Sequence, residues 1–132
     1  RQNERDPRLS TAALAAGRLA CARQATASEP YLFAFGLQDV AGQVEGLRGA
    51  RAGLSRRLRA AATGAPDRDK LAPLLAAITE GSRELDRLAA ADLAGDRMAV
   101  EAGLARFDDR VAAERERSRR LGLGDCLVRP AA

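Results

Sequence analysis

The stretch that decides the fold is residues 96–126, DRMAVEAGLARFDDRVAAERERSRRLGLGDC. Its central residues Leu104, Phe107 and Val111 recur at steps of three and four, the spacing of a helix packed in a bundle. The full series at this spacing is Met98, Glu101, Leu104, Phe107, Val111, Glu114, Ser118 and Leu121. Asp96 is a suitable N-cap, and Gly122 and Gly124 can close the helix in the left-handed conformation. The stretch therefore predicts a closing helix, with Cys126 on a turn just beyond it.

The composition predicts an all-helical single domain. The chain has 132 residues, only 3% of which are aromatic, and no stretch alternates apolar with polar residues as a strand would. No apolar run approaches the roughly 20 residues that span a membrane. The 22 basic and 18 acidic residues give a net charge of +4, which indicates a mixed surface with a basic excess.

Upstream of the closing helix, the pattern predicts three further helices. The first runs from Leu9 to about Thr26 and carries Leu14, Cys21 and Ala25 on one side, with Cys21 in its last turns. The second starts at Ser28-Glu29-Pro30, where serine can cap and proline fits the first turn, and ends near Ala62. Its heptad leaves one step to be filled by Ala50 or Arg51, and its apolar members are Phe33, Leu37, Val40, Val44, Leu47, Leu54 and Leu58.

A third helix is expected after the turn Gly64-Ala65-Pro66. It begins between Asp67 and Lys70, with Asp69 as the preferred cap, and it ends near Ala94. Its apolar stripe is Leu71, Leu74, Ile78, Leu85 and Leu88. Because short turns make sequential helices antiparallel neighbours, we expect an up-down-up-down four-helix bundle over residues 9–132. Residues 1–8 are expected to be a flexible linker, and because the chain begins at Arg1, we also expect a segment upstream of it.

The two cysteines suggest one disulfide between Cys21 and Cys126. In an up-down bundle the ends of the first and fourth helices lie at opposite poles, so Cys126 has to reach back along the first helix. The alternative is a pair of unrelated reduced thiols in a cytosolic protein. A persistent disulfide would imply an oxidising, extracytoplasmic compartment.

Residues 90–126, AADLAGDRMAVEAGLARFDDRVAAERERSRRLGLGDC, resemble the C-terminal half of small secreted or lipid-anchored helical proteins of actinobacteria. In these proteins an early cysteine on the first helix accompanies a closing LGL-x-x-C, which Cys21, Gly122, Leu123 and Cys126 match. Gly95-Asp96 matches the turn before the last helix. The sequence departs from the pattern at Arg23-Gln24, since an asparagine commonly follows the first cysteine. The resemblance implies the fold and export, without an activity.

The residue types argue against an enzyme, a metal site or a bound cofactor. The chain has no histidine, which removes the usual general base and the commonest metal ligand. P-loop, dinucleotide and serine-hydrolase motifs are also missing. Carboxylates such as Asp92 and Glu101 could pair, but most acids stand at helical spacing from arginines, as in Glu116 with Arg120 and Glu80 with Arg83. Such pairs are typical of solvated helix faces.

Two features remain as candidate sites. The first is a basic surface that could contact an anionic partner. It would be formed by Arg115, Arg119 and Arg120, together with Arg117 and with Arg56, Arg57 and Arg59. Tyr31 and Phe35 lie off the core stripe, so they either cap the bundle end or line a small apolar pocket. For both features the ordinary structural role, a solvated face or a capped core, is the favoured interpretation.

These observations predict a non-enzymatic, extracytoplasmic binding or spacer module of the cell envelope. It would be secreted or anchored by lipid to the outer face of the membrane. Its partner would be an envelope protein, an anionic polymer or a lipid surface, and a homo-oligomer is also compatible with the sequence. One alternative is a cytosolic, arginine-rich bundle that binds nucleic acid, although no aromatic residues interleave with the arginines for base stacking. Another is a module that senses a small apolar ligand.

Overall fold

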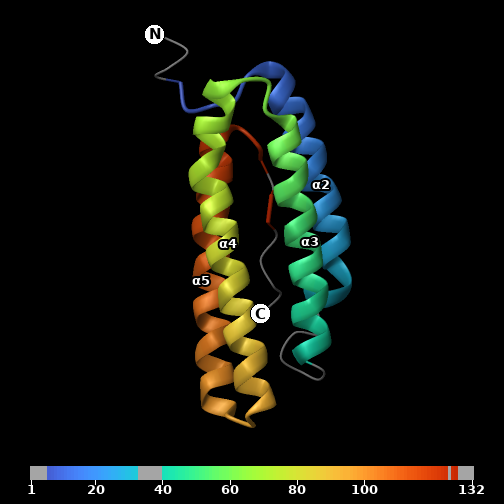
Figure 1. Cartoon of the computed structure of the whole chain (residues 1–132), viewed down its shortest axis with the longest axis vertical. Helices are drawn as coiled ribbons and strands as arrows, with labels where there is room; N and C mark the ends of the chain where they lie inside the picture. The colour runs from blue at the N-terminus through green and yellow to red at the C-terminus, as the bar shows by residue number, and fades with distance from the viewer. Residues whose placement is uncertain (1–5, 33–39, 125, 128–132) are drawn as a thin grey trace.

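The computed structural model describes residues 6–32, 40–124 and 126–127. It contains four antiparallel helices, α2 (Thr11–Leu32), α3 (Val40–Ala61), α4 (Ala65–Leu93) and α5 (Arg97–Leu121). Figure 1 shows them as an up-down-up-down bundle, which confirms the predicted fold class. Among the described residues, no helix combines the length and the apolar character that crossing a membrane requires.

The predicted boundary between the first two helices is wrong. Helix α2 continues through Ser28 and Pro30 to Leu32, instead of ending near Thr26. Ser28 is not a cap, because it is fully buried inside α2 and its Oγ donates to the carbonyl oxygen of Gln24 at 2.7 Å. Pro30 lies in the last turn of α2 and supplies no N–H to the carbonyl oxygen one turn earlier. The described part of the second helix begins at Val40, and the predicted heptad positions Phe33 and Leu37 lie outside the described residues.

Helix α4 begins earlier than predicted, at Ala65, with Gly64 before it and Pro66 in its first turn. Proline fits there because the N–H that it lacks would have no partner within the helix. Asp69 is therefore inside the helix and does not cap it. The turn Gly95-Asp96 and the ends of α5 are as predicted.

Helix α5 has well-formed ends. The Asp96 carboxylate accepts from the backbone N–H of Ala99 at 3.0 Å. At the other end Gly122 has φ 88°, and the N–H groups of Gly122 and Leu123 donate to the carbonyl oxygens of Arg119 and Ser118. This is the Schellman arrangement, in which a left-handed glycine turns the chain back on the helix.

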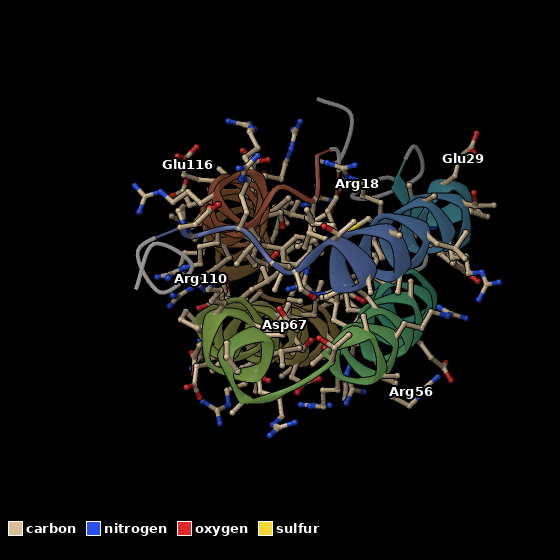
Figure 2. All side chains as sticks on the ribbon, turned by 90° about the horizontal axis from the view of Figure 1, so that it is seen from above. Arg18, Glu29, Arg56, Asp67, Arg110 and Glu116 are labelled. Carbon is tan, nitrogen blue, oxygen red and sulfur yellow. A yellow bond between two sulfur atoms is a disulfide. The ribbon has the colours of Figure 1, made fainter. Side chains whose placement is uncertain are left out.

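The C-terminal residues 122–124 and 126–127, which we call the C-terminal segment, close the bundle. Helices α2, α3, α4 and α5 pack in sequence order, whereas the first and last helices do not pack closely. The segment runs back between α2 and α5 (Figures 1 and 2). Its side chains Leu123, Cys126 and Leu127 are buried, and a Cβ on Gly17 of α2 would lie 2.5 Å from Cδ2 of Leu123. The segment thus lies between α2 and α5 and takes the place of a direct contact between these two helices.

A disulfide joins Cys21 of α2 to Cys126 of this segment, with Cα atoms 4.7 Å apart, so the predicted pairing is present. Cys21 lies in the middle of α2 and not in its last turns, because α2 is longer than predicted. As the order of the helices predicts, Cys126 meets Cys21 only because the chain runs back down the bundle after α5. The carbonyl oxygen of Gly122 also accepts from Nε of Arg18 at 3.0 Å, which ties the start of the segment to α2.

The apolar core consists of two clusters. The upper cluster surrounds the disulfide and includes Leu54, Leu58, Leu71, Leu74 and Ile78. The lower cluster contains Val40, Val44, Leu47, Leu85, Leu88, Phe107 and Val111. The predicted stripe of α4 is buried throughout, and so are the described apolar positions of the α3 heptad.

The start of the α5 stripe is an exception. Met98 is 82% exposed, Glu101 is also exposed, and Leu104 is only partly buried. Figure 1 shows the reason, since the hairpin of α4 and α5 extends beyond the end of α3 and no helix of the described part of the chain packs on it there. Met98 and Glu101, which continue the spacing of the stripe, therefore face solvent.

Reduction of the disulfide is expected to destabilise the folded protein. The bond closes a loop with a sequence separation of 105 residues. The chain-entropy model assigns a loop of that length roughly 4–5 kcal/mol. Thermal unfolding followed by circular dichroism should then show a melting temperature about 10–20 °C lower after full reduction, or in a C21S/C126S variant. An unchanged melting temperature in protein whose two thiols titrate would contradict this expectation.

Candidate functional site

Charged and polar side chains cross the bundle between the two apolar clusters. We call this set the polar layer; it comprises Gln24, Ser28, Arg51, Glu114 and Ser118, each at most 3% exposed. Its centre is an ion pair between Arg51 of α3 and Glu114 of α5. Nη1 of Arg51 donates to Oε1 of Glu114 at 3.0 Å, and Nη2 donates to Oε2 and to the carbonyl oxygen of Ile78. The guanidinium group therefore connects α3, α4 and α5.

Two neighbours make room for the ion pair and stabilise it. A side chain at Gly81 of α4 would collide with the Arg51 guanidinium and with Glu114, so only glycine leaves the required space. The Arg51 guanidinium also lies 5.3 Å from the ring centre of Phe107, in cation–π contact. Burial raises the pKa of the Glu114 carboxyl, and the Arg51 charge works against that shift. Glycine at position 81 is therefore required by the packing of this ion pair.

The sequence contains a signal for this site. Arg51 is one of the two residues that the heptad left open, and Ala50 and Arg51 are in fact both buried. Glu114 and Ser118 continue the helical spacing of the predicted apolar stripe of α5, and both are buried. A charged residue at a core position on each of two helices is a reason to expect a buried ion pair.

Removal of one partner of this ion pair should cost more than removal of both. Arg51→Met leaves the Glu114 carboxylate buried without a counterion, and such a change typically costs about 3–5 kcal/mol. The double variant R51M/E114L replaces both charges by apolar groups and should regain most of that loss. Urea unfolding measures the free energies.

Arg48→Met is the matched control on the same helix. Its ion pair with Asp86 has both side chains 54% exposed, so its loss should cost at most about 1 kcal/mol. A cost for R51M as small as that for R48M would contradict the structural role of the buried pair.

A second buried acid, Asp67, joins the helix starts at one end of the bundle. Its carboxylate accepts from the backbone N–H and hydroxyl of Ser10 at 2.9 and 2.7 Å, and from the N–H and hydroxyl of Thr63 at 3.0 and 2.6 Å. In Figure 2 Asp67 points inward between the ends of the helices. Burial by itself would raise the pKa of Asp67, but these hydrogen bonds outweigh it and hold the pKa well below its usual range.

Asp67 should make stability fall in acid. Because its pKa in the folded state is below the unfolded value of about 3.9, the folded protein binds fewer protons there. The contribution of Asp67 is therefore complete above about pH 5 and is lost as the pH falls towards the folded-state pKa. Asp67→Asn should lower the free energy of unfolding at pH 7 by roughly 1.5–3 kcal/mol.

The D67N variant should also lose less stability than the parent protein when the pH falls from about 5 to about 2. Glu84 contributes in the same direction in both proteins, because Arg106 and Arg87 hold its pKa below the usual value in spite of burial. Parallel stability–pH curves for the parent and the D67N variant would contradict the role of Asp67.

Two arginines of the predicted basic face on α5 share one carboxylate. Glu116 pairs with Arg119 at 3.2 Å and with Arg120 at 3.6 Å. Arg115 is half-buried and takes part in no ion pair with the described residues. Glu116 points outward in Figure 2, so these pairs lie on the solvated surface. The pairing of Glu80 with Arg83 follows the same helical spacing.

Two arginines of α3 differ from those of α5. A Cβ on Gly53 would lie 3.1 Å from Nη1 of Arg57 and 3.7 Å from Nη2 of Arg56, so both guanidinium groups converge over this glycine. They border a hollow of about 540 Å³ between α2 and α3, which we call the Arg56–Arg57 hollow. Neither arginine forms an ion pair with a described residue. From the sequence we had placed Arg56 and Arg57 in one basic surface with the arginines of α5. The structure distinguishes the two groups by their different neighbours.

The second predicted feature is partly described. Tyr31 is half-buried and its ring rests on Gly46 of α3, at the other end of the same hollow. Tyr31 thus packs against the neighbouring helix and joins the lower apolar cluster. Phe35 lies outside the described residues, so the predicted apolar pocket stays a prediction. Asp92 and Glu101 are both exposed, and the described residues contain no group of three potential metal ligands.

Comparisons of the chain with protein-family models, with curated proteins and with solved structures found no match. The resemblance to small actinobacterial proteins therefore stays a prediction.

Proposed function

We propose that the protein is a non-enzymatic binding or spacer module of the cell envelope, located outside the cytoplasm. The observation that carries this proposal is the disulfide between Cys21 and Cys126, each 1% exposed. Disulfides persist in secreted and envelope proteins and are rare in the cytosol, where thiols are kept reduced. A bond that holds the C-terminal segment inside the bundle suits a domain that has to stay folded without cytosolic chaperones.

The environment of the acids supports a non-catalytic role. Among the described residues, each of the three buried carboxylates is engaged in holding helices together: Asp67 by hydrogen bonds to Ser10 and Thr63, and Glu114 by Arg51. Glu84 is held by Arg87 at 2.6 Å and by Arg106 at 3.1 Å. A general acid or base needs a carboxyl that faces a substrate, and these three face their structural partners.

The Arg56–Arg57 hollow is the surface that best suits an anionic partner. Two guanidinium groups without a carboxylate partner can both donate to one phosphate group. Phosphate is the chemistry shared by anionic wall polymers and lipid headgroups. The face around Arg115, Arg119 and Arg120 is less suitable, because Glu116 already accepts from two of these arginines.

The compartment is tested in cells that produce the whole protein from its own gene. Acid quenching followed by alkylation should find both cysteines unreactive, and fractionation should place the protein in the medium or on the outer face of the membrane. Two reactive thiols in a cytosolic fraction would contradict the proposal and favour the alternative of a cytosolic protein that binds nucleic acid.

The partner is tested with purified, oxidised protein on vesicles of anionic phospholipid and on soluble polyphosphate. Binding should be measurable at about 0.01 M salt and much weaker at about 0.15 M, where charges are screened beyond about 8 Å. R56E/R57E should abolish it, whereas R119E/R120E, with the same change in net charge, should retain most of it. Equal loss in both variants would indicate attraction by net charge alone. No binding at low salt would remove the anionic partner and leave the spacer role.

A further inference from the structure

Of three buried side-chain polar atoms that lack a hydrogen-bond partner among the described residues, two belong to the polar layer. They are Oε1 of Gln24, on α2, and Nε of Arg51, on α3. The two residues are 3% and 2% exposed, so bulk water does not reach them freely. One atom is an acceptor and the other is a donor. Buried polar groups without hydrogen bonds are rare, because each loses its hydration without compensation.

Both residues line the same small internal cavity of about 10 Å³. Ser28 contributes a third polar side chain, and the rest of the wall is apolar, formed by Leu47, Phe107, Val111 and Leu127. A water molecule needs about 10–15 Å³ of such space and two to four polar partners. The cavity thus has the size and the polar groups that suit one water molecule.

We propose that this cavity is an internal binding site for a single water molecule. Its oxygen accepts from Nε–H of Arg51, and one of its hydrogens is donated to Oε1 of Gln24. The charges around the site select water over ions. A cation would face the Arg51 guanidinium, and an anion would face the carbonyl oxygen of Gln24 with the Glu114 carboxylate beyond Arg51.

The water completes a hydrogen-bond network through all four helices. Arg51 already connects α3 to Glu114 of α5 and to the carbonyl oxygen of Ile78 of α4. Gln24 and Ser28 bond only to each other within α2, where Nε2 of Gln24 donates to Oγ of Ser28 at 2.7 Å. The bound water is the link that joins this α2 pair to the rest of the polar layer.

Leu127 seals the site. It is 1% exposed, lines the cavity, and follows Cys126 directly in the chain. Its φ is 60°, in the left-handed region that a leucine rarely adopts, so its backbone is strained. Such a conformation persists only where the surroundings hold it, and the disulfide at the preceding residue supplies that restraint. The disulfide therefore keeps the water enclosed as well as the chain folded.

The water site is tested by a crystal structure at better than 1.5 Å and by solution NMR. We expect electron density for one water within hydrogen-bond distance of Gln24 Oε1 and Arg51 Nε. We also expect a cross-relaxation signal from water to the Nε–H proton of Arg51. Gln24→Met keeps the shape but removes the acceptor, and should abolish both signals.

Gln43→Met is the matched control, because Oε1 of Gln43 also lacks a partner but Gln43 does not line the cavity. This variant should leave both signals unchanged. A cavity without density in the parent protein, or a water signal that survives Q24M, would overturn the proposal.

The seal is tested by hydrogen exchange at Nε–H of Arg51. Reduction by dithiothreitol, which forms two protein thiols and a cyclic disulfide of the reagent, should raise the exchange rate at least tenfold. Leu127→Gly tests the same point in protein that keeps its disulfide, since glycine adopts φ 60° without strain and removes the covering side chain. It should also raise the rate. An unchanged rate in both experiments would overturn the sealing role of Leu127.

Discussion

The Cys21–Cys126 disulfide holds the C-terminal segment between the first and last helices, and the closed bundle depends on that arrangement. In many up-down bundles the fourth side is formed by direct contact between the first and fourth helices. Here Leu123, Cys126 and Leu127 occupy that side, and Gly17 provides the space for Leu123. Loss of the segment would expose the apolar faces of both helices. The disulfide thus acts on the packing of the native state as well as on the entropy of the unfolded chain.

The buried charged residues of this protein hold the helices in position. Arg51 and Glu114 lie between two apolar clusters, and the need to pair them fixes the register of α3, α4 and α5 relative to one another. An ion pair of this kind adds little net stability, because desolvation offsets much of the attraction, but a shifted register would leave a charge unpaired at high cost. Asp67 plays a comparable role at the bundle end, where it joins the start of α2 to the turn between α3 and α4. Because these buried charged groups are engaged with other residues of the protein, the groups that a partner could contact are those on the surface.

Among the surface arginines, the neighbouring acids decide which positive charges are available. On α5 the spacing of Glu116 brings it within reach of Arg119 and Arg120. On α3 no described acid reaches Arg56 or Arg57, and Gly53 leaves room for both guanidinium groups to approach one point. This contrast is the basis for placing an anionic partner at α3 in the proposed function. The envelope location rests on separate evidence, the disulfide, so the two parts of the proposal do not depend on each other.

The sequence by itself determined the helical class, the four helices, the apolar stripes of α3 and α4, the caps of α5 and the pairing of the cysteines. Periodicity and capping act within one or two turns of a single helix, so they can be seen without the other helices. The wrong predictions concern positions where a local sequence pattern competes with tertiary packing. Ser28 and Pro30 have the local pattern of a helix start, but burial of Ser28 against the bundle carries α2 past them.

Only the tertiary structure decided which stripe residues have partners, as at Met98, where the hairpin extends beyond its neighbours. It also decided that Arg51 meets Glu114 and that Gln24 faces Arg51 across one cavity. These are contacts between residues far apart in the chain, and they depend on the relative rotation and register of whole helices, which no local pattern encodes.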